Sequence, residues 1–323
     1  MILVKVSNLT IPVLIYTDAG RDVDDVEAIT YLVGSPNVEI VGVVTTHMIP
    51  DRRAFIARTV LDNLGKTDVP IGVGSIFPIG KDEEVLAKYL KEHTIEGKTY
   101  EGEGLIECFH DGVDLIHELI GKYGSQLKIA VQAPLTDLAK AALKDEENFC
   151  KVGGLYIQGQ AIVDGLTLLT DNNAYNIKED EEASRIIFGL QDRIELTFVG
   201  KHAAYEVPFL REDFALLAST GNPVGRYLKI HAEKGLECFA IRAPDIFKRV
   251  FGVDANKVHE LKKLSNPYDA LVAKAIGKPD DLSGVKVGKH TLIGMNENNT
   301  GVEDPELVKS DLMNTMLKAL KGQ

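Results

Sequence analysis

Apolar and polar residues alternate along the chain in two distinct patterns. Short, almost wholly apolar runs have the length of single β-strands and lie at residues 11–16, 38–46, 69–74, 127–132, 154–159 and 194–199. Segments with apolar residues at helical spacing follow most of them, at residues 23–33, 52–64, 113–123, 134–139 and 179–188. Near-continuous apolar strands are typical of parallel sheets covered on both faces. The alternation therefore predicts an α/β fold, with a mostly parallel, open, doubly wound central sheet flanked by helices.

The last part of the chain has a different pattern. Residues 203–276 are largely helical in pattern, residues 284–295 fit two short strands or a hairpin, and a final helix is expected at 305–320. Neither an internal repeat nor a linker rich in Pro, Gly or Ser divides the sequence. We therefore expect one domain covering residues 1–323, with a largely helical C-terminal part.

Residues 76–109 form an insertion between two predicted α/β units. The segment is charged, contains glycine and is only weakly periodic, with one helix expected near residues 84–92. Because it follows a predicted strand, it is a candidate lid or substrate loop at the ligand-binding edge of the sheet. An ordinary surface excursion explains the same pattern equally well, so both interpretations stay open.

Composition narrows the classes of partner and the compartment. The 323-residue chain has a formal net charge of −12, which argues against nucleic acid or an anionic membrane surface as a partner. Cys108, Cys150 and Cys238 are too few and too widely spaced for a disulfide framework or a zinc knuckle. No apolar run approaches the roughly 20 residues that span a membrane, and the N-terminal residues lack a signal-peptide pattern. We expect a cytoplasmic protein.

An acidic turn directly follows the first predicted strand. It contains Asp18, Asp22, Asp24 and Asp25, and Gly20 permits a sharp change of direction. The turn lies at the carboxyl end of the strand, the edge where open parallel sheets bind ligands. One or two aspartates can cap the following helix, but four together repel one another unless a cation lies between them. Oxygen ligands suit Ca²⁺ or Mg²⁺, so the turn favours a metal site over a purely structural acidic cap.

Several motifs resemble one family of enzymes. The turn has the form Asp-x-Gly-x-Asp-x-Asp-Asp, which resembles the longer N-terminal signature of the inosine–uridine-preferring nucleoside hydrolases. Residues 132–139 are similar to the family's Gly-Pro-Leu-Thr-Asn-x-Ala segment, residues 174–183 to its "Phe-Asn…Asp-Pro-Glu-Ala" stretch, and residues 268–273 to its C-terminal Asp-Pro-Leu-Ala-x-Ala helix start. The resemblance extends from about residue 11 to the end of the chain. The order and spacing of the motifs are the main evidence for it.

The resemblance implies a Ca²⁺ site, with Mg²⁺ as the second option. Asp18, Asp25 and Asp269 match the metal-binding carboxylates of the family, and Gln132 matches a residue that contributes its backbone carbonyl. Asp22 belongs to the longer form of the turn and is an extra ligand or a cap. We expect these oxygens, from both ends of the chain, to meet around one ion. The rest of the predicted site depends on this arrangement.

The resemblance also implies which residues bind the sugar. Asp24 matches the residue that receives a ribose hydroxyl, and Asn176 matches an amide that binds the sugar hydroxyls. Asn172 or Asn173 is expected to help Asn176. His47 follows the second predicted strand where the family tends to place an asparagine that contacts the ribose.

The activity that the resemblance implies is hydrolysis of the N-glycosidic bond of a ribonucleoside, giving ribose and the free base. A Ca²⁺-bound water would attack the anomeric carbon while Asp18 takes its proton. Candidates for protonating the leaving base are Tyr268, at a position where the family commonly has histidine, and His93, His110, His202 and His231. Of the histidines, His202 follows the last predicted parallel strand and is the first to test. The resemblance further implies a role in purine or pyrimidine salvage and a homodimer or homotetramer.

Several positions depart from the family pattern. Tyr16 stands where the family has an aspartate, Tyr268 replaces a histidine and Ala174 replaces an acidic residue that contacts the sugar. These changes leave the metal set whole but point toward a modified nucleoside or another ribosyl compound as the substrate. Two alternatives remain: a catalytically inactive ribose- or nucleoside-binding protein on the same scaffold, and a Mg²⁺-dependent phosphohydrolase. The second needs a nucleophilic aspartate at position 16, which Tyr16 does not provide.

Overall fold

A nine-stranded sheet forms the centre of the protein. The structure, a computed structural model, describes residues 10–20, 22–79 and 109–323, and the strands lie in the order β12-β13-β9-β6-β5-β1-β2-β3-β4. These strands are β1 (Ile11–Thr17), β2 (Val38–Thr45), β3 (Ile71–Val73), β4 (His110–Asp111), β5 (Lys128–Val131), β6 (Gly154–Gln158), β9 (Leu196–Val199), β12 (Val285–Val287) and β13 (His290–Ile293). Neighbouring strands are parallel except for the antiparallel pair β12 and β13. The expected mostly parallel α/β sheet is confirmed.

Helices connect the strands and cover both faces of the sheet. They are α1 (Asp24–Gly34), α2 (Pro50–Asn63), α4 (Gly112–Tyr123), α5 (Thr136–Lys144), α6 (Glu146–Phe149), α7 (Tyr175–Glu179), α8 (Glu181–Gly189), α9 (Lys201–Glu206), α10 (Arg211–Ala218), α11 (Pro223–Arg242), α12 (Pro244–Phe251), α13 (Tyr268–Gly277) and α14 (Pro305–Lys321). Aspartates cap several of them, as at α8, where the Asp180 carboxylate accepts a hydrogen bond from the Ala183 amide. The largely helical pattern of residues 203–276 is therefore confirmed in α9 to α13.

The side chains of β1 divide between two hydrophobic cores. Val13 and Ile15 pack into the core shared with α1, α2, α13 and α14, whereas Leu14 and Tyr16 pack into the core shared with α4, α5 and α8. Alternate residues of a strand point to opposite faces of the sheet. The near-continuous apolar sequence of this strand therefore reflects burial on both sides, as expected for a doubly wound sheet.

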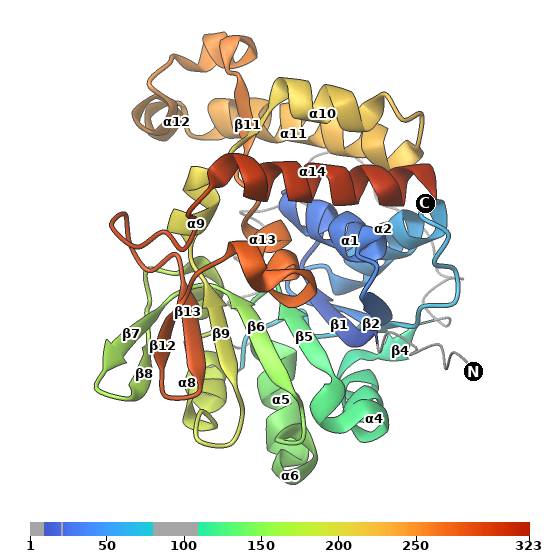
Figure 1. Cartoon of the computed structure of the whole chain (residues 1–323), viewed down its shortest axis with the longest axis vertical. Coiled ribbons are helices and arrows are strands. Elements are labelled where there is room, and N and C mark those ends of the chain that lie inside the picture. The colour runs from blue at the N-terminus through green and yellow to red at the C-terminus, as the bar shows by residue number, and fades with distance from the viewer. Residues whose placement is uncertain (1–9, 21, 80–108) are drawn as a thin grey trace, which may run out of the picture.

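The C-terminal helix packs closely against the first helix of the chain. Figure 1 shows α14 running beside α1, with α10 and α11 on its outer side. A Cβ atom at Gly34 would lie only 2.0 Å from the Thr315 carbonyl oxygen, so this close approach requires glycine. The first and last helices of the described chain are therefore part of one packed layer.

A buried ion network reinforces this layer. Lys274 of α13 is fully buried, and its Nζ lies 2.9 Å from Asp281 Oδ2 and 2.8 Å from Asp311 Oδ2. The Tyr31 hydroxyl of α1 donates to the same Asp311 oxygen at 3.1 Å. The network connects α1, α13 and α14, and so fixes the two helices that carry the acidic residues described below.

Other elements differ in how well the sequence indicated them. The expected pair at residues 284–295 is the β12–β13 hairpin, whereas the exposed hairpin of β7 (Ala161–Asp164) and β8 (Thr167–Thr170) and the short pair β10 (Phe209–Leu210) and β11 (Lys263–Ser265) were not predicted. Most of the insertion, with its expected helix and His93, lies outside the described residues, as does Cys108. Within the described ranges, no helix has the length and apolar character needed to cross a bilayer. The expectation of one domain over residues 1–323 stays a prediction.

Candidate active site

The acidic turn lies at the point where the order of the strands reverses. From β1 the chain adds β2, β3 and β4 on one side of the sheet, and β5, β6 and β9 later form on the other side. The carboxyl ends of β1 and β5 thus flank a topological switch point, where open α/β sheets bind their ligands. The turn after β1 and the segment after β5 both open onto this point.

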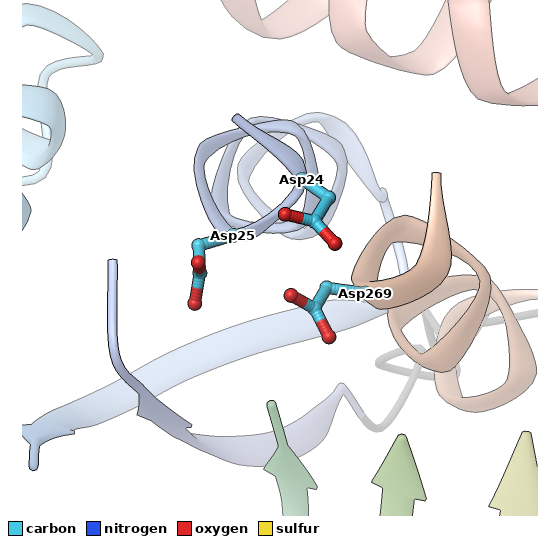
Figure 2. A group of neighbouring side chains, drawn as sticks. All are labelled: Asp24, Asp25 and Asp269. Carbon is cyan, nitrogen blue, oxygen red and sulfur yellow. The ribbon is translucent and has the colours of Figure 1, made fainter. Parts of the chain in front are cut away.

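Three carboxylates converge there from opposite ends of the chain. Asp24 and Asp25 begin α1 and Asp269 lies in the first turn of α13, and one oxygen of each lies within 4.8 Å of the others. Figure 2 shows the Asp24 and Asp269 side chains facing each other between the two helices, with the Asp25 side chain pointing from α1 to one side of them. Asp25 is 4% exposed and Asp269 is 3% exposed. The positive ends of two helix dipoles therefore face the cluster, which favours negative charge there.

The electrostatics of the cluster are strongly unfavourable for three free carboxylates. Burial, followed by the charge of neighbouring acidic groups, raises the pKa of Asp24, Asp25 and Asp269 well above the usual range. Burial also raises the pKa of Glu27, one turn along α1, to about 8. The Oδ1 atom of Asp269 is buried and has no hydrogen-bond partner among the residues that the structure describes. A cation at this point would remove both the repulsion and the unsatisfied oxygen.

Asp18 lies beside the cluster and pairs with an arginine. Its Oδ2 atom is 3.8 Å from Nη2 of Arg53. Its charge helps to raise the pKa of Asp25 and Asp269, which places it within electrostatic range of both. The cluster of three carboxylates contains Asp24, for which a contact with the ribose was expected, and does not contain Asp18. The role of Asp18 as a metal ligand stays a prediction.

Gln132 lies at the end of β5, next to the turn after β1. Its amide donates to the Tyr16 carbonyl at 2.8 Å, and its side chain is 2% exposed. In the described part of the chain, neither its side-chain oxygen nor its side-chain nitrogen has a hydrogen-bond partner. Ala130 of the same strand packs into the core with α13, so the alternation of the strand directs Gln132 toward that side of the sheet as well.

The residues expected to bind the sugar occupy different environments. Asn176 is buried in α7, and its Nδ2 donates to Gln158 Oε1, at the carboxyl end of β6, at 2.9 Å. Asn172 and Asn173 are exposed, and Asn173 donates from both its backbone and its side-chain nitrogen to Asp171 Oδ1 at 2.9 Å. Asn176 is therefore fixed by the sheet, while the other two amides belong to a surface turn.

His47 has an unusual backbone conformation at the end of β2. Its φ angle is 69°, and that of Met48 is 60°. Left-handed backbone is uncommon outside glycine, and it often marks a functional segment. His47 is buried, its amide donates to the Ser75 carbonyl at 2.8 Å, and its own carbonyl accepts from Arg53 Nε at 2.9 Å.

Tyr268 is the residue next to Asp269 at the start of α13. Its hydroxyl accepts a hydrogen bond from Asn266 Nδ2 at 3.1 Å, and burial raises its pKa above the usual value. The ring of Tyr205 makes edge contacts with both Tyr268 and His202. The structure therefore brings His202 and Tyr268 together through Tyr205.

The other two candidate histidines, His110 and His231, lie in different environments. His110 is exposed in β4 at the edge of the sheet. His231 stacks on Tyr227 of the same helix, α11, with ring centroids 3.8 Å apart. Burial and then the charge of Asp25 raise the pKa of Tyr227 to about 12. Tyr227 was not among the predicted residues, although the four-residue spacing of Tyr227 and His231 places both on one face of a helix.

The departure at position 16 does not disturb the acidic cluster. Tyr16 is fully buried in the core on the opposite face, where its hydroxyl bonds to the Pro134 carbonyl at 2.9 Å and accepts from the Asp137 amide at 3.0 Å. The Asp137 carboxylate in turn accepts from Thr46, Ser75 and Tyr16. Tyr16 and Asp137 thus fasten α5 to the end of β1 beneath the site.

Comparison with known proteins identifies the family. The sequence pattern described as inosine-uridine preferring nucleoside hydrolase matches residues 13–297. The chain belongs to this family. Membership confirms both the resemblance seen in the sequence and the enzyme class, a hydrolase acting on N-glycosidic bonds. Nucleoside hydrolases are generally metal-dependent, and the acidic cluster of this chain is where such a dependence would arise.

Individual nucleoside hydrolases are distant relatives. The chain is 25% identical over 218 residues to the pyrimidine-specific ribonucleoside hydrolase RihA of Citrobacter koseri, covering 67% of this chain and 68% of that protein. The purine-preferring ribonucleoside hydrolase from Gardnerella vaginalis has a TM-score of 0.67 at 20% identity, over 96% of this chain and 99% of that one. The type III effector protein XopQ, solved with adenosine diphosphate ribose, has a TM-score of 0.80 at 24% identity, over 97% and 94%. These structures share the fold with the present chain.

Proposed function

We propose that this protein hydrolyses the N-glycosidic bond of a ribonucleoside or a related ribosyl compound, and that Ca²⁺ or Mg²⁺ bound at the acidic cluster assists it. The observation that carries the proposal is the convergence of Asp24, Asp25 and Asp269 at the switch point of a nucleoside-hydrolase sheet. Membership of the family indicates the class of reaction, and the acidic cluster is the site at which we expect the reaction to take place.

The donor set fits a hard divalent cation. Its members are oxygen atoms, and three of them belong to carboxylates with raised pKa values. Within the described ranges, Asp269 Oδ1 has no hydrogen-bond partner. Asp25 and Asp269 are the ligands common to the cluster and to the sequence-based set. Asp18 and the Gln132 carbonyl would complete the set, with Asp24 close enough to share it. Such an ion would supply positive charge among the carboxylates and make a water molecule more acidic.

The side chains divide the reaction between them. Asp24 and Asn176 hold the ribose hydroxyls, which orients the anomeric carbon. Asp18 accepts a proton from the attacking water as the carbon–oxygen bond forms and the carbon–nitrogen bond breaks. The surrounding carboxylates stabilise the positive charge that develops on the ribose, as in other glycosidic hydrolysis. A proton-transfer group such as Asp18 contributes about 10²–10⁴-fold to the rate.

The leaving base departs toward an aromatic group of side chains. Tyr268 accepts a hydrogen bond from Asn266, and its phenol proton would pass to the base nitrogen as the base leaves. His202 supports Tyr268 through Tyr205. The stacked rings of Tyr227 and His231 lie near Asp25 and offer a flat surface to a heterocycle. The high pKa of Tyr268 makes it a weak acid, which favours substrates whose base leaves readily.

Two observations favour a second candidate function, ribose binding without hydrolysis. Ala174 is buried at the position where the resemblance places an acidic residue that contacts the sugar. XopQ, which shares the fold, is described as an effector in complex with adenosine diphosphate ribose rather than as a hydrolase. The phosphohydrolase alternative has no corresponding support, because Tyr16 is buried on the opposite face of the sheet.

The remaining expectations belong to the same proposal. We propose that the protein acts in the cytoplasm, in salvage of purine or pyrimidine nucleosides, and as a homodimer or homotetramer. These three proposals, on compartment, pathway role and subunit number, are supported by membership of the family alone. Light scattering on the purified protein tests the subunit number, and a monomer would contradict it.

A reducing-sugar assay tests the proposed function. Wild type, Asp25→Asn and the control Asp164→Asn, at an exposed hairpin position, are assayed on uridine, cytidine, inosine and adenosine with and without a chelator. We expect sugar release that the chelator and Asp25→Asn both abolish, while Asp164→Asn behaves as wild type. Sugar release that survives the chelator would contradict the metal-assisted reaction. Calorimetric binding of adenosine diphosphate ribose without any sugar release would favour the second candidate function.

A further inference from the structure

Arg53 is a buried arginine between two turns of the candidate active site. It lies in the first turn of α2 and is 5% exposed. Its Nε donates to the His47 carbonyl at 2.9 Å, and its Nη1 donates to the Ala19 carbonyl at 3.3 Å. Its Nη2 lies 3.8 Å from Asp18 Oδ2. One guanidinium therefore joins the turn after β1 to the turn after β2.

The turn after β2 needs such support because of its backbone. His47 and Met48 both have positive φ angles, 69° and 60°. Each non-glycine residue in this conformation costs roughly 1–2 kcal/mol. Their amides donate to the carbonyls of Ser75, at 2.8 Å, and Ile76, at 3.0 Å, on one side. Arg53 holds the other side of the turn through the His47 carbonyl.

The outer side of the same turn is anchored independently of Arg53. The Ser75 amide donates to Asp137 Oδ1 at 2.9 Å, and Asp137 is itself almost fully buried. A continuous series of polar contacts thus leads from Asp137 through Ser75 and His47 to Arg53 and Asp18. Arg53 is the point at which this series reaches the acidic turn.

The chemistry of arginine suits this position better than that of lysine. A guanidinium is planar, carries several donors in a fixed fork and stays charged. It can therefore serve two carbonyls and face a carboxylate at the same time. An ammonium group would keep the charge but, as a single point on a flexible stem, could not hold both turns in one geometry.

We propose that Arg53 is a positioning residue of the active site, which fixes the Asp18 carboxylate and the His47 backbone relative to the acidic cluster. The inference rests on the proposed function, because it assigns Arg53 to the same site. Arg53 would contact neither the ion nor the substrate, and would act through the two turns that it joins.

The test separates the effect of the forked hydrogen-bond donors of Arg53 from the effect of its positive charge. Arg53→Lys keeps the charge and removes the fork. Arg58→Lys is the matched control: Arg58 lies on the same helix, and its guanidinium also binds a carboxylate, Asp62, and a carbonyl, that of Val69, both at 2.7 Å. Each protein is stripped with a chelator and titrated with Ca²⁺ by calorimetry. Sugar release is then measured with 4-nitrophenyl β-D-ribofuranoside as the probe, and folding is checked by thermal unfolding.

We expect Arg53→Lys to weaken Ca²⁺ binding and to lower kcat, each by about 10- to 100-fold, the usual effect of losing a residue that orients metal ligands. Arg58→Lys should match wild type in both measurements. In the Asp18→Asn background, Arg53→Lys should cause little further loss of Ca²⁺ affinity, because the two residues act together. If Arg53→Lys does not fold, Arg53→Gln is the second variant, and a lower kcat supports the proposal.

Two results would overturn the positioning role. Arg53→Lys could match wild type in both Ca²⁺ affinity and kcat, which would mean that charge alone suffices. It could also melt at a lower temperature while both quantities stay unchanged, which would make Arg53 a purely structural residue. Wild type that neither binds Ca²⁺ nor releases sugar would remove the proposed function itself, and this outcome is seen before any variant is compared.

Discussion

At the scale of single residues, the site is defined by charge. The carboxylates of Asp24, Asp25 and Asp269 are desolvated and lie close enough to raise one another's pKa. Arg53 reaches the neighbouring Asp18, so the site combines a fixed positive charge with several acidic groups. A divalent cation among the carboxylates would allow all of them to ionise together.

The first prediction concerns the proton acceptor. Asp18→Asn removes the group that takes the proton from the attacking water, so kcat should fall by about 10²–10⁴-fold. Steady-state kinetics on the best nucleoside of the panel measure the loss, with Asp164→Asn as the exposed control. An Asp18→Asn protein with wild-type kcat would show that another group accepts the proton.

The second prediction concerns pH and Glu27. Burial raises the pKa of this carboxyl group in the folded protein from 4.5 to about 8, so the folded state binds a proton more tightly than the unfolded state. The stability that Glu27 contributes is therefore complete below its unfolded pKa and is lost as the pH rises through about 8. Thermal unfolding in chelator should show wild type losing stability over this range, and Glu27→Gln losing less. Equal pH dependence of the two proteins would contradict the assignment.

At the scale of secondary structure, the site depends on how α1 and α13 are held. The fully buried Lys274 connects α13 to α14 through Asp311, and Tyr31 connects α1 to the same carboxylate. The second residue of α13 is Asp269, so this network also determines where that ligand stands.

The third prediction tests the network. Lys274→Met removes the buried ammonium group that faces Asp281 and Asp311 and leaves the partly exposed Lys278 as their nearest cation, so it should lower the free energy of unfolding by about 3–5 kcal/mol. Lys278→Met is the control: Lys278 also lies 2.8 Å from Asp311, but its side chain is 47% exposed. Its loss should cost only about 0–1 kcal/mol. Urea unfolding measures both, and equal effects of the two substitutions would show that the buried contacts add nothing.

The elements differ in how well the sequence indicated them. β1, β2, β5, β6 and β9 were predictable because strands covered on both faces are almost wholly apolar. β4 contains only His110 and Asp111, and the β7–β8 hairpin exposes Ile162, Leu166 and Leu169, so neither has the pattern of a buried strand. Arg53 also gave no signal, because a charged residue in a helix is usually exposed. It is buried here because two carbonyls from separate turns accept its hydrogen bonds.

At the scale of the whole molecule, the fold brings together residues that are far apart in the sequence. The acidic turn could be interpreted from its own residues, since four aspartates on one strand end require an explanation. Asp269 could not, because nothing in its surroundings along the chain marks it as a ligand. Only the resemblance to a family placed it beside Asp25. The physical reason is the packing of α13 against α1, which depends on many contacts spread over the chain.

Calcium titration of the chelator-stripped protein tests the central claim most directly. Wild type should bind one ion per chain and regain sugar release in proportion to the bound ion. Asp269→Asn should fold normally but lose both the binding and the recovery, because one of the converging carboxylates is gone. If Asp269→Asn binds Ca²⁺ and releases sugar as wild type does, the ion is not held where the two ends of the chain meet.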